Sequence, residues 1–387
     1  MNEISKFIDC NYDQKKKWRA MYVTEDEKGL AIVCSSKSLS SLEIRSILTD
    51  IKHIISAKAV LGKYDTLYIV IPEFNPNDKL VYILLEHIVY SLSKDYGYKV
   101  NLKIRDFTSN INTRGFFSTP LGILAQGIYN EDHFAREHMF SINKNHYRRI
   151  IKKNGNEMDT SNMLSEIKTF LFRFSMPDEF KSEFAKVVTE LADNASEHGH
   201  ADCCVDIDIT EPDYKKNKEN TDEYNYYGIN VVVLNFSNTC LGDDIKYKIQ
   251  NHCYSESERY DMVERAYQYH KKFFSKKRYC EEDFFNITVF QEKISGRRNE
   301  SKSGGTGLAE LIRNLQEYAY DDYCYVLTGD KGIFFKKNML NFSEDKWIGF
   351  NDSNNYISDL PNDSVLFRSG TFLPGTGYNF MFIFKEH

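Results

Sequence analysis

The stretch VVTELADNASEHGH, from Val187 to His200, decides the fold because its polar side chains recur at intervals of four in a helix-like run. Each residue of a helix turns by about 100°, so Glu190, Asn194 and His198 share one stripe, and the apolar residues between them can face a core. A carboxylate beside a carboxamide suits a hydrated Mg²⁺ ion, and a carboxylate can polarise a water molecule for attack on a phosphate. An exposed polar helix face is the alternative interpretation.

The composition predicts a soluble globular protein. The chain has 387 residues, 41% hydrophobic and 27% charged, which favours two or three domains. It contains no apolar run long enough to span a membrane and no signal peptide at the N-terminus, so we expect a cytoplasmic protein without a membrane partner. A net charge of −6 does not indicate nucleic-acid binding, and eight cysteines without a C-x-x-C pair favour reduced thiols.

The first third of the chain alternates strand-like and helix-like segments, which predicts an α/β domain over residues 1–135. Residues 136–160 follow as a predicted helical linker. Within them the basic tract HYRRIIKKNG, residues 146–155, is interpreted as a solvated helix face.

The remainder of the chain predicts a helix followed by two strands and a long excursion. The apolar segments CCVDIDIT (203–210) and YYGINVVVLNFS (226–237) are strand-like, and residues 241–303 form a long charged segment rich in aromatic residues. Near the C-terminus, YCYVLTGDKGIFFKK predicts two strands with a turn around Gly329, Asp330 and Gly332. Residues 341–370 are a polar insertion that the pattern does not place.

A second motif, SGGTGLAELI from Ser303 to Ile312, has three glycines in four positions directly before a helix. Glycines let the backbone approach a ligand closely, and the free N–H groups at a helix start favour an anion. The motif is neither a P-loop nor a dinucleotide fingerprint, because the spacings differ. It predicts a phosphate-binding loop.

Together the two motifs resemble the GHKL superfamily, which includes gyrase, heat-shock chaperones, sensor histidine kinases and mismatch-repair ATPases. The N box of that family has the pattern E-x-x-x-N-A-x-x-H, which ELADNASEH matches, and its glycine-rich box has the pattern G-x-G-L, which GGTGL matches. The resemblance implies bound ATP, Mg²⁺ held through Asn194, and Glu190 as the base that activates water. The other implied nucleotide-binding residues are His198, Asn235, Gly304, Gly305, Thr306, Gly307, Leu308 and Thr376.

The chain departs from the family in its middle box. The family has D-x-G-x-G after the second strand, and its Asp bonds the adenine amino group; here the run is NFSNTCLG, with Asn235 in place of Asp. The resemblance makes residues 241–303 the lid over the nucleotide. There Arg297, Arg298 and Lys302 either reach the phosphates or form a solvated basic loop.

The resemblance also implies the architecture, which is α/β (α+β). Residues 161–387 would form a two-layer sandwich of mixed β-sheet and helices. Residues 1–135 resemble STAS-type domains, which precede some bacterial GHKL modules. A homodimer that forms on ATP binding is implied by analogy alone.

A zinc site is an alternative for the segment HGHADCC. His198, His200, Cys203 and Cys204 have ligand side chains, but adjacent cysteines on a strand point to opposite faces. The cysteines are therefore interpreted as core residues.

Three functional classes remain. The favoured one is an ATPase that switches conformation or contacts with a protein partner, in a bacterial regulatory or phage-defence system. The alternatives are a serine kinase of the anti-sigma type and a nucleotide-sensing module that does not hydrolyse ATP. Histidine autophosphorylation is not favoured, because His138 and His146 lack the sequence context of a phosphoacceptor.

Overall fold

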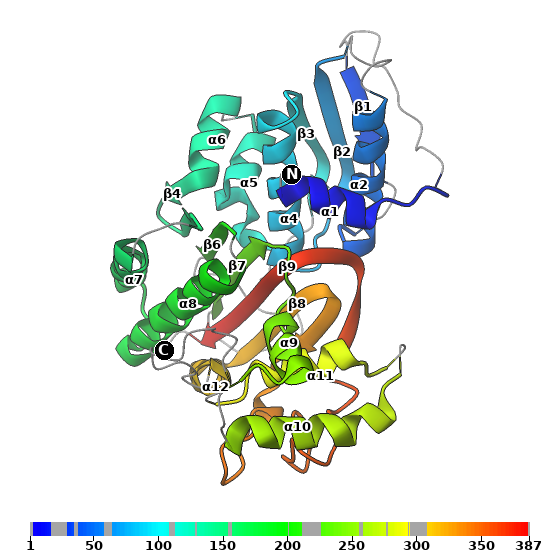
Figure 1. The fold of residues 1–387 in the computed structure, drawn as a ribbon. Helices are drawn as coiled ribbons and strands as arrows, with labels where there is room; N and C mark the ends of the chain where they lie inside the picture. Colours follow the sequence, from blue (N-terminus) through cyan, green and yellow to red (C-terminus); the bar gives the residue numbers. More distant parts are fainter. Residues whose placement is uncertain are drawn as a thin grey trace.

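The computed structural model contains two β-sheets, one parallel and one antiparallel, with helices between and around them (Figure 1). It describes residues 3–16, 29–34, 38–57, 64–107, 113–127, 130–153, 157–199, 201–210, 226–254, 258–275, 278–292, 294 and 308–385. The predicted mixed α/β class is confirmed.

The N-terminal layer is a three-stranded parallel sheet with order β1-β2-β3. Its strands are β1 (Gly29–Val33), β2 (Thr66–Phe74) and β3 (Lys99–Phe107), connected by α2 (Ser41–Ser56) and α4 (Lys79–Lys94). Parallel strands need such helical crossovers, so the predicted alternation of strands and helices is confirmed. The layer also includes α1 (Glu3–Asn11), η1 (Arg114–Ser118), α5 (Pro120–Ala125) and α6 (Glu131–Met139).

The second sheet is antiparallel, with order β4-β5-β6-β7-β9-β8. Its strands are β4 (Phe140–Ile142), β5 (His146–Ile151), β6 (Cys203–Ile209), β7 (Tyr226–Phe236), β8 (Asp321–Phe334) and β9 (Leu366–Lys385). Both faces of this sheet are buried. Successive side chains of a strand point to opposite faces, so alternate residues join two different cores. In β7, for example, Val231 and Val233 join the core with α7 (Glu157–Phe172), α8 (Asp178–Gly199) and α12 (Leu308–Tyr318), while Val232 and Leu234 join the core with the N-terminal layer.

Strand β8 doubles back on itself, as its orange ribbon shows in Figure 1. The Phe335 N–H donates to the Cys324 carbonyl at 2.8 Å, although the two residues would lie about 35 Å apart in one straight strand. The reversal lies at Gly329, where the pairing with β9 shifts register. The turn predicted near Gly329 is therefore present, but the structure has one bent strand, β8, in place of the two predicted strands.

The helical linker predicted for residues 136–160 is wrong in its central part, which forms two strands. β4 and β5 lie there, and β5 pairs with both β4 and β6. The basic tract is not a solvated helix face: Arg148 is fully buried against the N-terminal layer, and Arg149 on the other face pairs with Glu166 of α7. Each charge has a partner on its own side of the sheet, so the tract can form an inner strand.

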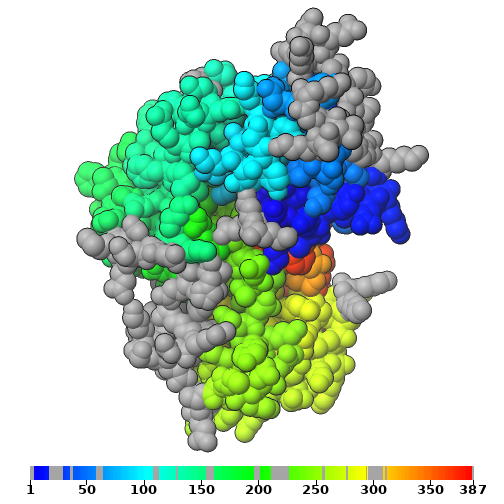
Figure 2. Space-filling view, turned by 45° about the horizontal axis from the view of Figure 1, so that its top comes forward, coloured from blue at the N-terminus to red at the C-terminus, as the bar shows by residue number. Residues whose placement is uncertain are grey.

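Two polar-looking segments form a compact lobe below the antiparallel sheet (Figure 1). The first of them, coloured green to yellow, is the part of the lobe that is visible at the bottom of Figure 2. The first contains α9 (Asp243–Asn251), α10 (Glu258–His270), η2 (Lys271–Phe273) and α11 (Glu281–Thr288), and the second is the insertion at 341–365, which follows η3 (Lys337–Met339). Trp347 and Tyr356 of the insertion stack at 5.0 Å, and the Tyr356 hydroxyl bonds the Thr288 hydroxyl at 2.7 Å. The insertion that the sequence did not place therefore closes the core of this lobe.

None of the helices within the described ranges is both long enough and apolar enough to cross a membrane.

Candidate functional site

Helix α8 carries the predicted polar stripe beside its buried apolar face. Leu191 is fully buried, whereas Glu190 and Asn194 are half-buried and lie one turn apart. The helix continues to Gly199, and the side chain of His198 lies outside the described residues. The structure thus brings two of the three stripe residues to one side of α8.

The glycine-rich motif is described only from its last member. Leu308 is the first residue of α12, and its side chain is buried in the core that α12 shares with α8. The other predicted residues of this loop are Gly304, Gly305, Thr306 and Gly307, which lie outside the described residues. Their role at the phosphates stays a prediction.

A row of polar side chains crosses the helix-covered face of the antiparallel sheet. Asn235 in β7 pairs with Thr376 in β9, and Thr376 pairs with Thr328 in β8. Strand alternation puts all three on the face of Val233 and Val326, whose side chains belong to the core shared with α8 and α12. These three residues are the polar row, and they are 3%, 9% and 2% exposed for Asn235, Thr376 and Thr328.

The Asn235 side chain connects the polar row to α8. Its Nδ2 donates to the Ala195 carbonyl at 3.1 Å, and its Oδ1 accepts from the Thr376 N–H at 2.9 Å. Ala195 directly follows Asn194 in the helix, so this amide holds the carbonyl next to the predicted magnesium ligand against the sheet.

The backbone beside the polar row requires glycine at position 375. Gly375 has φ +113°, and a Cβ there would lie 2.3 Å from the Asn235 carbonyl oxygen and 2.7 Å from the Ser237 nitrogen. The Thr328 hydroxyl donates to the Gly375 carbonyl at 2.7 Å and accepts from the Leu241 N–H at 3.0 Å. This tight packing fixes the end of β7 against the middle of β8 and β9.

Two polar groups at this place remain available for a ligand. No hydrogen bond within the described part of the chain involves the Thr376 hydroxyl or the Asn194 side-chain amide. A hydroxyl can donate or accept, and an amide offers both an oxygen and an NH₂ group. The site therefore combines a polar row on the sheet with a carboxamide oxygen on the helix.

Sequence reasoning missed two members of this arrangement, Thr328 and the Ala195 carbonyl. One signal could have identified Thr328: it is the next residue after Cys324 and Val326 on the same face of the strand, and it is polar where that alternation predicts an apolar core residue. The Ala195 carbonyl had no sequence signal, because a side chain from another strand selects it.

Magnesium fits the Asn194 side chain better than zinc fits the cysteines. Mg²⁺ keeps several of its waters and needs few protein oxygens, so one free carboxamide oxygen is a suitable ligand. In the described ranges no group of three or more His, Cys, Asp or Glu side chains could hold a metal ion. Cys203 faces the α8 core and Cys204 faces the N-terminal layer, as predicted, and burial raises the pKa of both thiols.

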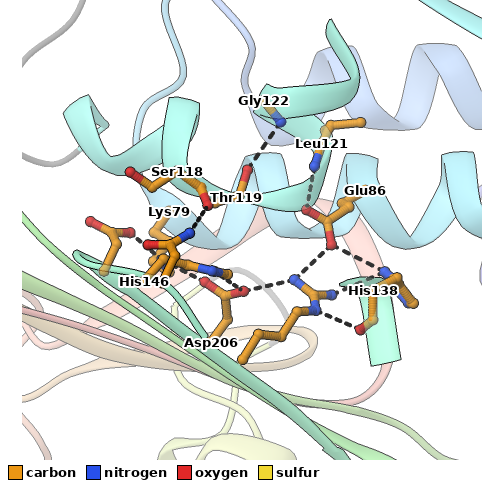
Figure 3. A network of polar contacts seen from close by, with 12 residues as sticks. Lys79, Glu86, Ser118, Thr119, Leu121, Gly122, His138, His146 and Asp206 are labelled. Carbon is orange, nitrogen blue, oxygen red and sulfur yellow. Dashed lines mark hydrogen bonds and ion pairs between the residues drawn. The ribbon is translucent and has the colours of Figure 1, made fainter. Parts of the chain in front are cut away.

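A second polar cluster lies on the other face of the sheet, where α4 crosses β5 and β6 (Figure 3). Lys79 pairs with Asp206 at 2.6 Å and with Asp208, and the Arg148 Nη1 lies 2.6 Å from Glu86 and 2.7 Å from Asp206. All five side chains are at most 1% exposed. We call these five residues the buried network; it is sealed from solvent and joins α4 of the N-terminal layer to the antiparallel sheet.

The electrostatics of the buried network follow from burial and from its cations. Burial raises the pKa of Glu86 more than Arg148 lowers it. Burial also disfavours the Asp206 carboxylate, but Lys79 and other cations outweigh this and hold its pKa well below the ordinary value. Burial, with Arg148 nearby, lowers the pKa of His138.

The same cluster bears on histidine phosphorylation. His138 and His146 are fully buried, with ring nitrogens 3.1 Å from Glu86 and 2.9 Å from Asp206. Both rings are therefore sealed from solvent in this fold.

A scan against protein-family models, a search of curated proteins and a search of solved structures each found no match to this chain. The assignment of the site rests on the residues themselves.

Proposed function

We propose that the chain is a Mg²⁺-dependent ATP-binding protein of the GHKL type, and that it hydrolyses ATP. The observation that carries the proposal is the polar row next to the last turns of α8. Asn235 and Thr376, predicted at opposite ends of the motif set, are neighbours on adjacent strands, and Asn235 bonds the residue after Asn194. Asn235 and Thr376, separated by 141 positions in the sequence, are thus joined by a hydrogen bond, which supports a shared role in binding one ligand.

Each residue has a role that its position supports. The Asn194 oxygen would hold Mg²⁺, and the ion when bound would neutralise phosphate charge. Glu190, one turn earlier, would accept a proton from the attacking water. Asn235 and Thr376 would contact the base, while the loop from Gly304 to Gly307, together with His198, would face the phosphates.

The proposal extends to the architecture. The antiparallel sheet with α7, α8 and α12 on one face would be the GHKL sandwich, and residues 241–303 would be its lid. The parallel strand–helix–strand layer is compatible with the STAS-like resemblance. As in the sequence-based expectation, we place the protein in a bacterial regulatory or phage-defence system with a protein partner.

The test is phosphate release from Mg²⁺-ATP, with nucleotide binding measured in parallel. Glu190→Ala should keep binding and lose about 10²- to 10⁴-fold in turnover, the usual cost of removing one positioned base. Glu179→Ala is the matched control, because Glu179 is an exposed carboxylate at the start of the same helix. Equal hydrolysis by both variants would contradict the role of Glu190.

The magnesium assignment is tested separately. Asn194→Ala should lose Mg²⁺-dependent ATP binding, and chelation of Mg²⁺ should have the same effect on the wild type. Asn162→Ala, an exposed asparagine of α7, is the control. Wild-type affinity in Asn194→Ala would show that the site lies elsewhere.

A further inference from the structure

The amide of Asn235 is held in one orientation by two bonds of opposite type. Its Nδ2 must be the donor, because the Ala195 partner is a carbonyl, and its Oδ1 must be the acceptor, because the Thr376 partner is an N–H. A carboxylate has no hydrogen to donate, so aspartate cannot make the Ala195 bond. The departure from the family motif therefore has a structural role in this chain.

The two bonds leave a donor and an acceptor on the same amide. An NH₂ group has two hydrogens and an amide oxygen has two lone pairs, so one of each stays unused on Asn235. The adjacent Thr376 hydroxyl is nine-tenths buried, makes no hydrogen bond within the described residues, and can rotate to donate or to accept. The polar row thus offers both hydrogen-bonding roles to a ligand.

Adenine and guanine differ in what they require at this place. Adenine has an amino donor at position 6 and an acceptor at N1, whereas guanine has an acceptor at position 6 and a donor at N1. A carboxylate accepts only, so it would pair with adenine and oppose the oxygen of guanine. An amide beside a rotatable hydroxyl satisfies either edge.

We propose that Asn235 makes the base site a general purine site, which binds guanine nucleotides nearly as well as adenine nucleotides. The inference rests on the proposed function, because it takes the base to lie against the polar row. It adds a substrate class, the purine nucleoside triphosphates, and names Asn235 as the residue that sets specificity.

The experiment measures the dissociation constants of ATP, GTP and ITP for the full chain with Mg²⁺. ITP has the oxygen of guanine at position 6 without the 2-amino group, so it isolates discrimination at position 6. GTP and ITP should bind the wild type within about 10-fold of ATP. By contrast, a site that accepts only one base would bind the other base up to about 10⁴-fold more weakly, because the mismatched base leaves a polar group of the site without a hydrogen bond.

Asn235→Asp should raise the ratio of the ITP to the ATP dissociation constant by about 10-fold or more, because a carboxylate opposes the oxygen at position 6. Asn238→Asp is the control: it adds the same charge three residues further along, on an exposed side chain, and should leave the ratio unchanged. If Asn235→Asp does not fold, the wild-type ratios alone decide.

The outcomes separate the two claims. Tight ATP binding with ITP and GTP weaker by more than about 100-fold would overturn the purine proposal and leave the ATP site standing. Binding of none of the three nucleotides would overturn the proposed function and the inference with it.

Discussion

Replacing Arg148 by methionine should destabilise the chain more than any exposed charge substitution. Its Nη1 contacts Glu86 and Asp206, and its Nε donates to the His138 carbonyl at 2.8 Å. Methionine keeps most of the side-chain length but leaves two buried carboxylates without this cation. The change therefore tests whether the buried network stabilises the contact between α4 and the antiparallel sheet.

The size of the expected loss in the free energy of unfolding follows from the complete burial of the ion pair. Breaking a fully buried ion pair by removing one partner costs about 3–5 kcal/mol, because the remaining charge stays desolvated. Lys79 and His146 still face Asp206, so Glu86 becomes the main unpaired charge. Adding Glu86→Gln to Arg148→Met should therefore recover part of the loss, as expected for coupled sites.

The neighbouring arginine provides the control. Arg149 pairs with Glu166, but these side chains are 19% and 30% exposed, so Arg149→Met should cost about 1 kcal/mol or less. Urea unfolding followed by circular dichroism gives both free energies of unfolding. Equal values for Arg148→Met and Arg149→Met would refute the argument that burial, and not the mere presence of a partner, sets the energy.

Three further predictions concern stability. Burial lowers the pKa of His87 and His138 below 6.5, so the unfolded chain binds more protons than the folded chain below that pH. The free energy of unfolding should therefore fall as the pH is lowered from about 7.5 to about 5.5, by at most about 1.4 kcal/mol per pH unit for each ring. A free energy of unfolding that does not change over this range would contradict the argument. Gly375→Ala should cost about 3 kcal/mol or more in urea unfolding, because its Cβ meets backbone atoms, whereas Gly97→Ala, with φ +71° and open space, should cost only about 1–2 kcal/mol. A chain of residues 140–387 should aggregate in sedimentation experiments, since it exposes the apolar sheet face that the N-terminal layer covers, and a monodisperse folded fragment would disprove this dependence.

Local patterns were sufficient to predict much of the fold and the helix that carries the candidate residues Glu190 and Asn194. The period of four in α8 and the apolar runs of β6 and β7 identify those elements directly. Asn235 and Thr376 were identified only through the family resemblance, and the structure makes them neighbours. Patterns of this kind succeed because helix and strand periodicity is a local property of the chain.

The failures share a cause, which is long-range pairing. Arg148 lies in a basic run, and its burial depends on Asp206, 58 residues away, and on Glu86 in another layer. The 341–365 insertion has a polar composition, but its Trp347 and Tyr356 complete a core begun by α10 and α11. No window of the sequence contains both members of such a pair.

The attachment of the lobe indicates where a bound nucleotide would act. The lobe begins directly after β7, and the Leu241 N–H is held by Thr328 of the polar row at 3.0 Å. A base at the row would thus lie one hydrogen bond from the first residue of the lobe, whereas the N-terminal layer is fixed to the opposite sheet face by the buried network. We therefore expect nucleotide to change hydrogen exchange in α9, and to leave exchange in α4 unchanged. The reverse pattern would mean that the two sheets, and not the lobe, respond to the nucleotide.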